Sequence, residues 1–214
     1  MLAGGVAALI AIGVVVFLVL GGGGDGGIIG GDGDTPATPA FDFELAKVVA
    51  VPTRPDAAAK KLHGMARPAA EDVAATMTDL YVGAFLDPEH WQHDDYDDVW
   101  SAFSDHAAAE AQTSVRVLTA GDAAGTTFDT IRPDEGTLRV KVLLDAKDQP
   151  FSVVAIVSFS ATGSATDGTD VLMKSTGQFV LEQTDGEWQI VSFHVQRNDQ
   201  AEEAPTPSAS VSPS

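Results

Sequence analysis

The residues best suited to chemistry lie close together in the stretch DPEHWQHDDYDD, which spans Asp87 to Asp98. His90 and His93 are three residues apart, so on a helix they would share a face and, with a nearby carboxylate, could hold a metal ion. The acidic run that starts at Asp94 is not an EF-hand loop, because it has no glycine at its sixth position and no glutamate at its twelfth. A site at His90 and His93 is therefore one hypothesis for this stretch.

The same composition is also typical of a helix start, which is the interpretation that we favour. Aspartate is preferred at the N-cap and in the first turn, where the helix dipole stabilises negative charge. Trp91 and Tyr96 would then pack the connection onto the core. A partner-binding loop remains a third interpretation. The capping role is assigned to Asp94 or Asp95, and the first turn to Asp97 or Asp98.

The elements before this stretch are predicted to be helical. Pro68 is expected at the first position of a helix, followed by carboxylates in the first turn. Apolar residues then recur at three- and four-residue spacing, and Pro88 predicts that the helix ends near Asp87. The preceding segment, residues 41–65, is ambiguous and fits a short strand and a short first helix.

A second helix is predicted from Asp95 to Gly121, with Gly121 as its C-terminal cap. A break near Ser104 or Asp105 is left open.

The second half of the chain changes to strand patterns. Asp134–Gly136 and Thr184–Gly186 are predicted to be hairpin turns. Residues 151–159 are apolar on both faces, which favours a central strand. The β-branched and aromatic residues that indicate strands are concentrated in TFDTIR, TLRVKVLLD, FSVVAIVSFSATG, VLMKSTGQFVLEQ and EWQIVSFHVQR. Helices followed by consecutive antiparallel strands predict an α+β domain with N-terminal helices on one face of a curved antiparallel sheet.

The last hairpin, STGQFVLEQTDGEWQIVSFHVQR, resembles that of the nuclear transport factor two-like superfamily. The shared pattern is a strand, an Asp-Gly turn, and a tryptophan and an isoleucine two apart on the final strand. The helix–helix–sheet order over residues 68–197 agrees with it. The resemblance implies a cone-shaped fold, and the layout resembles single-anchor members such as mammalian-cell-entry-associated membrane proteins and the periplasmic assembly factor of type IV secretion systems.

Enzymes of this superfamily place a base and hydrogen-bond donors inside the cone, so the resemblance implies a candidate pocket at His194, Trp188 and Tyr81. On the last strand, His194 alternates with Ser192, Ile190 and Trp188, which would place it on the pocket side, although a structural histidine is the alternative. No residue of this chain matches the family's catalytic aspartate with tyrosine partners. No Ser-His-Asp spacing or phosphate-binding glycine loop stands out either. We therefore predict no catalytic residue, no cofactor and no metal other than the His90 and His93 hypothesis.

Both ends of the chain differ from the domain at 41–199. Residues 1–20 carry no charged side chain and are about long enough to cross roughly 30 Å of hydrocarbon, which predicts a transmembrane anchor. A cleaved signal peptide is the alternative, although there is no basic start and no A-x-A-like site after Leu20. Residues 21–40 are expected to form a flexible glycine- and proline-rich linker, and residues 200–214 a disordered Pro/Ser-rich tail.

Charge and composition restrict the classes of function. The net charge is −19, from 31 acidic and 12 basic residues, which disfavours nucleic-acid binding. The chain has no cysteine, so disulfides and thiol chemistry are excluded. The first basic residue is Lys47, so nothing near the predicted anchor would retain the domain in the cytoplasm, and we expect it on the extracytoplasmic side of the cell membrane.

The leading hypothesis is thus a non-catalytic, membrane-anchored domain that contacts other proteins of the cell envelope, with a homodimer as a second expectation. The alternative is a small-ligand-binding or isomerase-like enzyme that uses the cone pocket.

Overall fold

The computed structural model describes residues 37–54 and 59–201 of the chain. The predicted anchor, residues 21–36 of the predicted linker and residues 202–214 of the predicted tail lie outside this range. None of the helices within it is long and apolar enough to cross a membrane.

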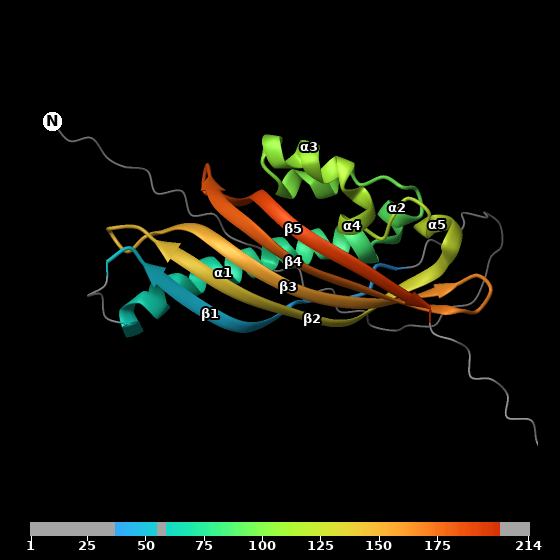
Figure 1. Ribbon diagram of the computed structural model, residues 1–214, viewed down its shortest axis with the longest axis horizontal. Coiled ribbons are helices and arrows are strands. Elements are labelled where there is room, and N and C mark those ends of the chain that lie inside the picture. Colours follow the sequence, from blue (N-terminus) through green and yellow to red (C-terminus); the bar gives the residue numbers. More distant parts are fainter. Residues whose placement is uncertain (1–36, 55–58, 202–214) are drawn as a thin grey trace, which may run out of the picture. The chain divides into compact units, whose positions relative to one another are not determined.

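A five-stranded sheet forms one layer, and helices pack against it (Figure 1). The strands follow the order β1-β2-β3-β4-β5, in which β2 to β5 are joined as antiparallel neighbours. The predicted α+β class is therefore confirmed. The strands span Glu44–Pro52 (β1), Phe128–Leu144 (β2), Pro150–Ala165 (β3), Asp170–Thr184 (β4) and Glu187–Ala201 (β5).

The sheet is mixed, so the prediction of a purely antiparallel sheet is wrong at one edge. β1 pairs with β2 in parallel, for example with Val48 opposite Val140. The connection from β1 to β2 contains all the helices, and a crossover of this length is what a parallel pair requires. β3 lies at the centre of the sheet, as the two-sided apolar pattern of residues 151–159 predicted.

The two predicted turns have different outcomes. Asp185 and Gly186 adopt positive φ angles of 53° and 93° and form the β4–β5 hairpin as predicted. The prediction of a turn at Asp134–Gly136 is wrong, because β2 continues through these residues with a register shift between Pro133 and Glu135. A Cβ at Gly136 would collide with the rings of Phe41 and Phe43, so this glycine allows a close approach of side chains and not a turn.

The first helix begins earlier than predicted. α1 spans Ala59–Tyr81, so Pro68 lies inside it and not at its start. Pro68 removes the backbone bond to the carbonyl of Gly64, but both residues are on the exposed side, where water can replace the lost bond. The buried side is uninterrupted: Leu62, Ala66, Ala70, Val73 and Met77 all face the core. A π-helix at Val82–Leu86 (η1) then continues to the predicted end at Asp87.

The second predicted helix is divided into short pieces. A 3-10 helix spans Asp97–Ala102 (η2), followed by α3 at Asp105–Thr113, α4 at Val115–Leu118 and α5 at Ala124–Thr127. The open alternative of a break is confirmed, because the Ser104 hydroxyl accepts from the backbone N–H of Ala107 and caps α3. A further four-residue helix, α2, spans Pro88–Trp91.

The core lies between α1 and the face of the sheet that α1 covers, called here the inner face. The rings of Phe43, Tyr81, Phe85, Phe159 and Phe179 contact one another at centroid distances of 5.1–6.3 Å. Met77 and Met173 are also fully buried. Aromatic and methionine side chains therefore fill the space that a cone-shaped fold would offer to a ligand.

Candidate functional site

The stretch Asp87–Asp98 forms helix ends and connections. Asp87 caps α2, because its Oδ1 accepts from the backbone N–H of Glu89 at 3.0 Å. The predicted N-cap at Asp94 or Asp95 is wrong, because the N-cap of η2 is Tyr96, which makes no side-chain cap bond. Asp95 Oδ1 instead accepts from the N–H of Asp97 at 3.3 Å, one residue before that cap. Asp97 and Asp98 occupy the first turn of η2, as the capping interpretation predicted, although the helix is 3-10 and not α.

The two aromatic residues of this stretch pack as expected. Trp91 is 2% exposed and Tyr96 is 3% exposed. Burial raises the pKa of Tyr96 to about 12, so its hydroxyl stays protonated at physiological pH. The Nε1 of Trp91 is buried without a hydrogen-bond partner in the described part of the chain. Tyr96 and Trp91 therefore serve as packing groups.

The histidines bind backbone carbonyls and do not converge. His90 Nδ1 lies 2.9 Å from the carbonyl oxygen of Gly83, and His93 Nδ1 lies 2.9 Å from that of Glu89. The nearest carboxylate oxygen to His90 is that of Asp87, at 3.9 Å. In residues 37–54 and 59–201, no three histidine or acidic side chains are arranged to hold a metal ion. The metal hypothesis for His90 and His93 thus has no geometric support.

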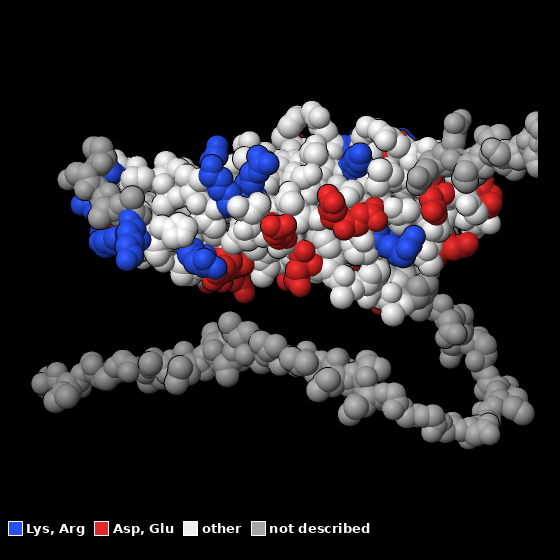
Figure 2. Space-filling model, turned by 90° about the horizontal axis from the view of Figure 1, so that it is seen from below, with Lys and Arg blue, Asp and Glu red and all other residues white. Residues whose placement is uncertain are grey.

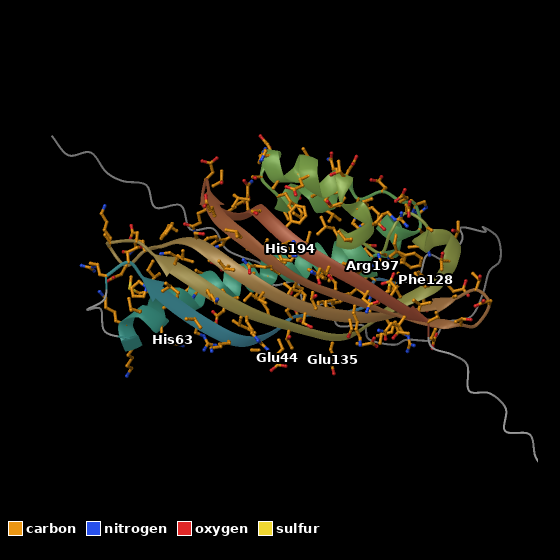
Figure 3. All side chains as sticks on the ribbon, viewed as in Figure 1. Glu44, His63, Phe128, Glu135, His194 and Arg197 are labelled. Carbon is orange, nitrogen blue, oxygen red and sulfur yellow. The ribbon has the colours of Figure 1, made fainter. Side chains whose placement is uncertain are left out.

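The three candidate pocket residues do not meet. Tyr81 is 2% exposed in the aromatic core, and its hydroxyl lies 3.1 Å from Ser175 Oγ. Trp188 is 7% exposed on the inner side of β5, whereas His194 is exposed on the opposite, outer face (Figure 3).

A bulge in β5 separates Trp188 from His194. Ile190 pairs with Leu181 and Ser192 pairs with Val180, so Val191 is an extra residue. An insertion of one residue exchanges the two faces of the strand beyond it. Trp188 and His194, which a regular strand would place on the same face, therefore lie on opposite faces.

Comparison of the chain with protein family models, with curated proteins and with solved structures found no match. The resemblance to the nuclear transport factor two-like superfamily accordingly stays a prediction.

The sequence interpretation missed a shallow acidic cleft of about 380 Å³ between α1, η2 and the β4–β5 hairpin. Asp72 and Asp79 line it from α1, and Glu187 and Trp188 from β5. Burial, together with the charge of Asp42, raises the pKa of Asp79. The lining as described contains carboxylates, hydroxyls, an amide and the Trp188 indole, but no histidine, lysine or arginine. Only the assembly of three elements creates this cleft, and no local sequence signal marks it.

Arg197 was also missed, and it has a structural role. Its Nη1 donates to the carbonyl oxygens of Thr119 and Arg116, and its Nη2 lies 2.7 Å from Asp199 Oδ2. The guanidinium stands 5.8 Å from the centre of the Phe85 ring, and the side chain is 9% exposed. Arg197 thus joins the end of α4 to β5 (Figure 3).

The outer face of the sheet is the broadest polar surface that the strands present. Half-exposed Val154, Ile156 and Val180 lie on this face, and its other central positions on β3, β4 and β5 are mainly polar, for example Ser158, Thr176, Gln178, His194 and Gln196. These polar side chains are exposed, so no described helix covers them. Among the described residues, the helices cover only the inner face and leave the outer face exposed.

Proposed function

We propose that this protein is a membrane-anchored, non-catalytic domain on the extracytoplasmic side of the cell membrane that makes protein–protein contacts in the cell envelope. The fold that we propose is the cone-shaped one of the nuclear transport factor two-like superfamily. The anchor is residues 1–20, and the partner is an envelope protein, with a second copy of the chain as the other candidate.

One observation carries this proposal: the inner side of the sheet is filled, while no helix of residues 37–54 and 59–201 covers the outer side. A binding pocket for a small molecule normally encloses several hundred Å³ of apolar space with a few convergent polar groups. Here the corresponding space holds Phe85, Phe159 and Phe179, each at most 2% exposed. The surface that remains for function is therefore a sheet face, which suits recognition of another protein.

The alternative, an enzyme or small-ligand binder that uses the cone, has less support. Of its three candidate residues, Tyr81 lies in the core, Trp188 lies beside the acidic cleft and His194 lies on the outer face. A general base must be within hydrogen-bond reach of the proton it removes, and no such arrangement joins Tyr81, Trp188 and His194.

Site-specific photocrosslinking of the full chain in its native membranes tests the proposal. A photoreactive residue at Gln178, on the outer face of β4, should give a discrete adduct with an envelope protein or with a second copy. The matched control is Ala75, which is exposed on α1. A chain that yields no adduct from Gln178 and purifies from membranes as a monomer without companions would contradict the proposed function.

A further inference from the structure

Seven of the chain's twelve lysine and arginine residues lie around one edge of the sheet, although the net charge is −19. Some occupy outward-facing positions on β1 and β2, and the others lie where β1 ends, α1 begins and β2 turns into β3. Figure 2 shows that basic side chains gather on the half of this view where α1 begins, while acidic ones dominate the other half. We call this surface the basic edge; its members are Lys47, Arg54, Lys60, Lys61, Arg139, Lys141 and Lys147.

Most of these cations have no counterion within the described residues. Arg54 and Lys61 share Asp148, at 3.1 and 3.0 Å. None of the other five makes an ion pair with a described carboxylate. Lys47 and Arg139 are opposite each other in the register of β1 and β2, so two unpaired positive charges are adjacent. In a chain with 31 acidic residues, this arrangement favours an external anionic partner.

The exposed large hydrophobic residues lie at the same edge. Val51 is 41% exposed and Phe151 is 45% exposed, and they are the two such residues in the described part of the chain. Val51 pairs with Leu143, and Phe151 follows Pro150, the partner of Leu144, so both are near the β2–β3 turn. Beside them, a depression of about 410 Å³ has Val49 and Ile156 in its apolar lining and Lys47, Arg139 and Lys141 around it.

Two carboxylates lie within the basic edge: Asp148, and Asp145, whose Oδ1 accepts from the backbone N–H of Lys147 at 2.8 Å. The seven cations of the basic edge therefore keep an excess of five positive charges among the described residues.

The other acidic groups at this end of the sheet are more distant. Glu182, Asp185 and Glu187 lie on β4, its hairpin and β5, which are separated from β1 by at least two intervening strands. With neighbouring strands about 4.8 Å apart, β4 is roughly 14 Å from β1 and roughly 10 Å from β2, which carries Arg139 and Lys141. The Debye length at physiological ionic strength is about 8 Å, so these carboxylates do not cancel the field of the basic edge.

From these observations we infer that the basic edge docks on an anionic phospholipid surface. The ammonium and guanidinium groups contact lipid phosphates, while Val51 and Phe151 insert among the headgroups. This inference rests on the membrane anchoring in the proposed function.

A lipid surface fits these features better than an acidic protein does. Apart from Val49 and Ile156 in the depression, only Val51 and Phe151 are large exposed hydrophobic residues in the described part of the chain, whereas a stable protein interface buries at least about 1,000 Å² with close complementarity. Long basic side chains around a small apolar area are instead typical of surfaces that bind the membrane interface.

The absence of cysteine allows a clean test. The full chain carrying Ala146→Cys, in the exposed β2–β3 turn, is labelled with a polarity-sensitive fluorophore and reconstituted in vesicles. Vesicles of phosphatidylcholine with phosphatidylglycerol should give a blue-shifted emission, which is lost at high salt. Vesicles of phosphatidylcholine alone should not. A label at Ala123→Cys, exposed between α4 and α5, is the control and should show the emission of a water-exposed fluorophore in both kinds of vesicle.

A charge-matched pair of variants identifies the surface. In K47Q/R139Q/K141Q, each lost charge should weaken the docking equilibrium about fivefold, so that together they abolish the blue shift. The control variant R116Q/R132Q/K174Q removes the same amount of positive charge from other elements and should retain the blue shift.

The outcomes separate this inference from the proposed function. If alkaline extraction releases the chain from the vesicles, the anchor is absent and the proposed function fails; flotation of the free chain with anionic vesicles then tests docking directly. If the chain stays embedded but its emission does not depend on lipid charge, the docking inference is overturned. A blue shift only in native membranes that contain other proteins would assign the edge to an acidic protein and would also overturn it.

Discussion

At the residue scale, polar side chains near the core pack against their neighbours and form hydrogen bonds within the protein. Tyr81 is the clearest example, since its ring stacks 5.4 Å from that of Phe85 while its hydroxyl reaches Ser175. Burial raises the pKa of Tyr81, and the hydrogen bond to Ser175 opposes this rise only in part. The Tyr81 phenol thus stays protonated within a filled core, where it packs and shares a hydrogen bond with Ser175.

The Tyr81→Phe substitution should therefore lower the free energy of unfolding by about 1–2 kcal/mol, because it leaves the buried Ser175 hydroxyl without a partner. Urea denaturation of the full chain measures this change. The double variant Tyr81→Phe, Ser175→Ala should recover part of the loss, since neither polar group then remains. Equal stability of the single variant and the parent chain would show that the bond contributes nothing.

At the scale of elements, local signals located the strands and helices but misjudged what proline and glycine do in them. Pro68 fits a helix start by composition, yet the buried stripe from Leu62 to Met77 holds a helix through it. Gly136 follows two acidic residues as in a turn, yet it lies beneath Phe41 and Phe43 within β2. In both cases, burial of apolar surface outweighs a local preference of about 1–3 kcal/mol.

Two glycine substitutions test this explanation. Gly136→Ala should destabilise the fold by about 1–3 kcal/mol, because its Cβ would displace the rings of Phe41 and Phe43. Gly64→Ala has no atom within 4 Å of the new Cβ and lies on the exposed side of α1, so it should stabilise by up to about 1 kcal/mol. Thermal unfolding of both variants measures these changes in stability. A Gly136→Ala variant as stable as the parent chain would contradict this account.

At the scale of the whole molecule, ion pairs join segments that are distant in the sequence, and charged residues also form distinct surfaces. Asp148 adopts a positive φ of 63° in the β2–β3 turn and binds Arg54 after β1 and Lys61 on α1. Hydrogen bonds from Lys61 and then Arg54 lower the pKa of Asp148. A carboxyl group with a lower pKa in the folded than in the unfolded chain stabilises the fold above its unfolded pKa, and this contribution disappears as the pH falls through the folded value.

The Asp148→Asn variant should consequently be less stable than the parent at pH 7, and the difference should shrink as the pH falls below about 4. Urea midpoints measured from pH 7 to pH 3 follow this change. Asp129→Asn, an exposed residue on β2 without an ion pair in the described part of the chain, is the control and should show no such trend. A constant difference across this range would exclude linkage through Asp148.

The sequence by itself determined the α+β class, the aspartates in the first turn of η2, the β4–β5 turn and the packing of Trp91 and Tyr96. Each of these depends on neighbours within a few residues or on periodic burial, which a sequence displays directly. The parallel pairing of β1, the face of His194, the acidic cleft and the basic edge were decided only by the tertiary structure. They depend on a bulge of one residue and on strands brought together from segments nearly a hundred residues apart, such as Lys47 and Arg139. Residue spacing along the chain carries no direct information about such contacts, because the side-chain face changes with every shift of register.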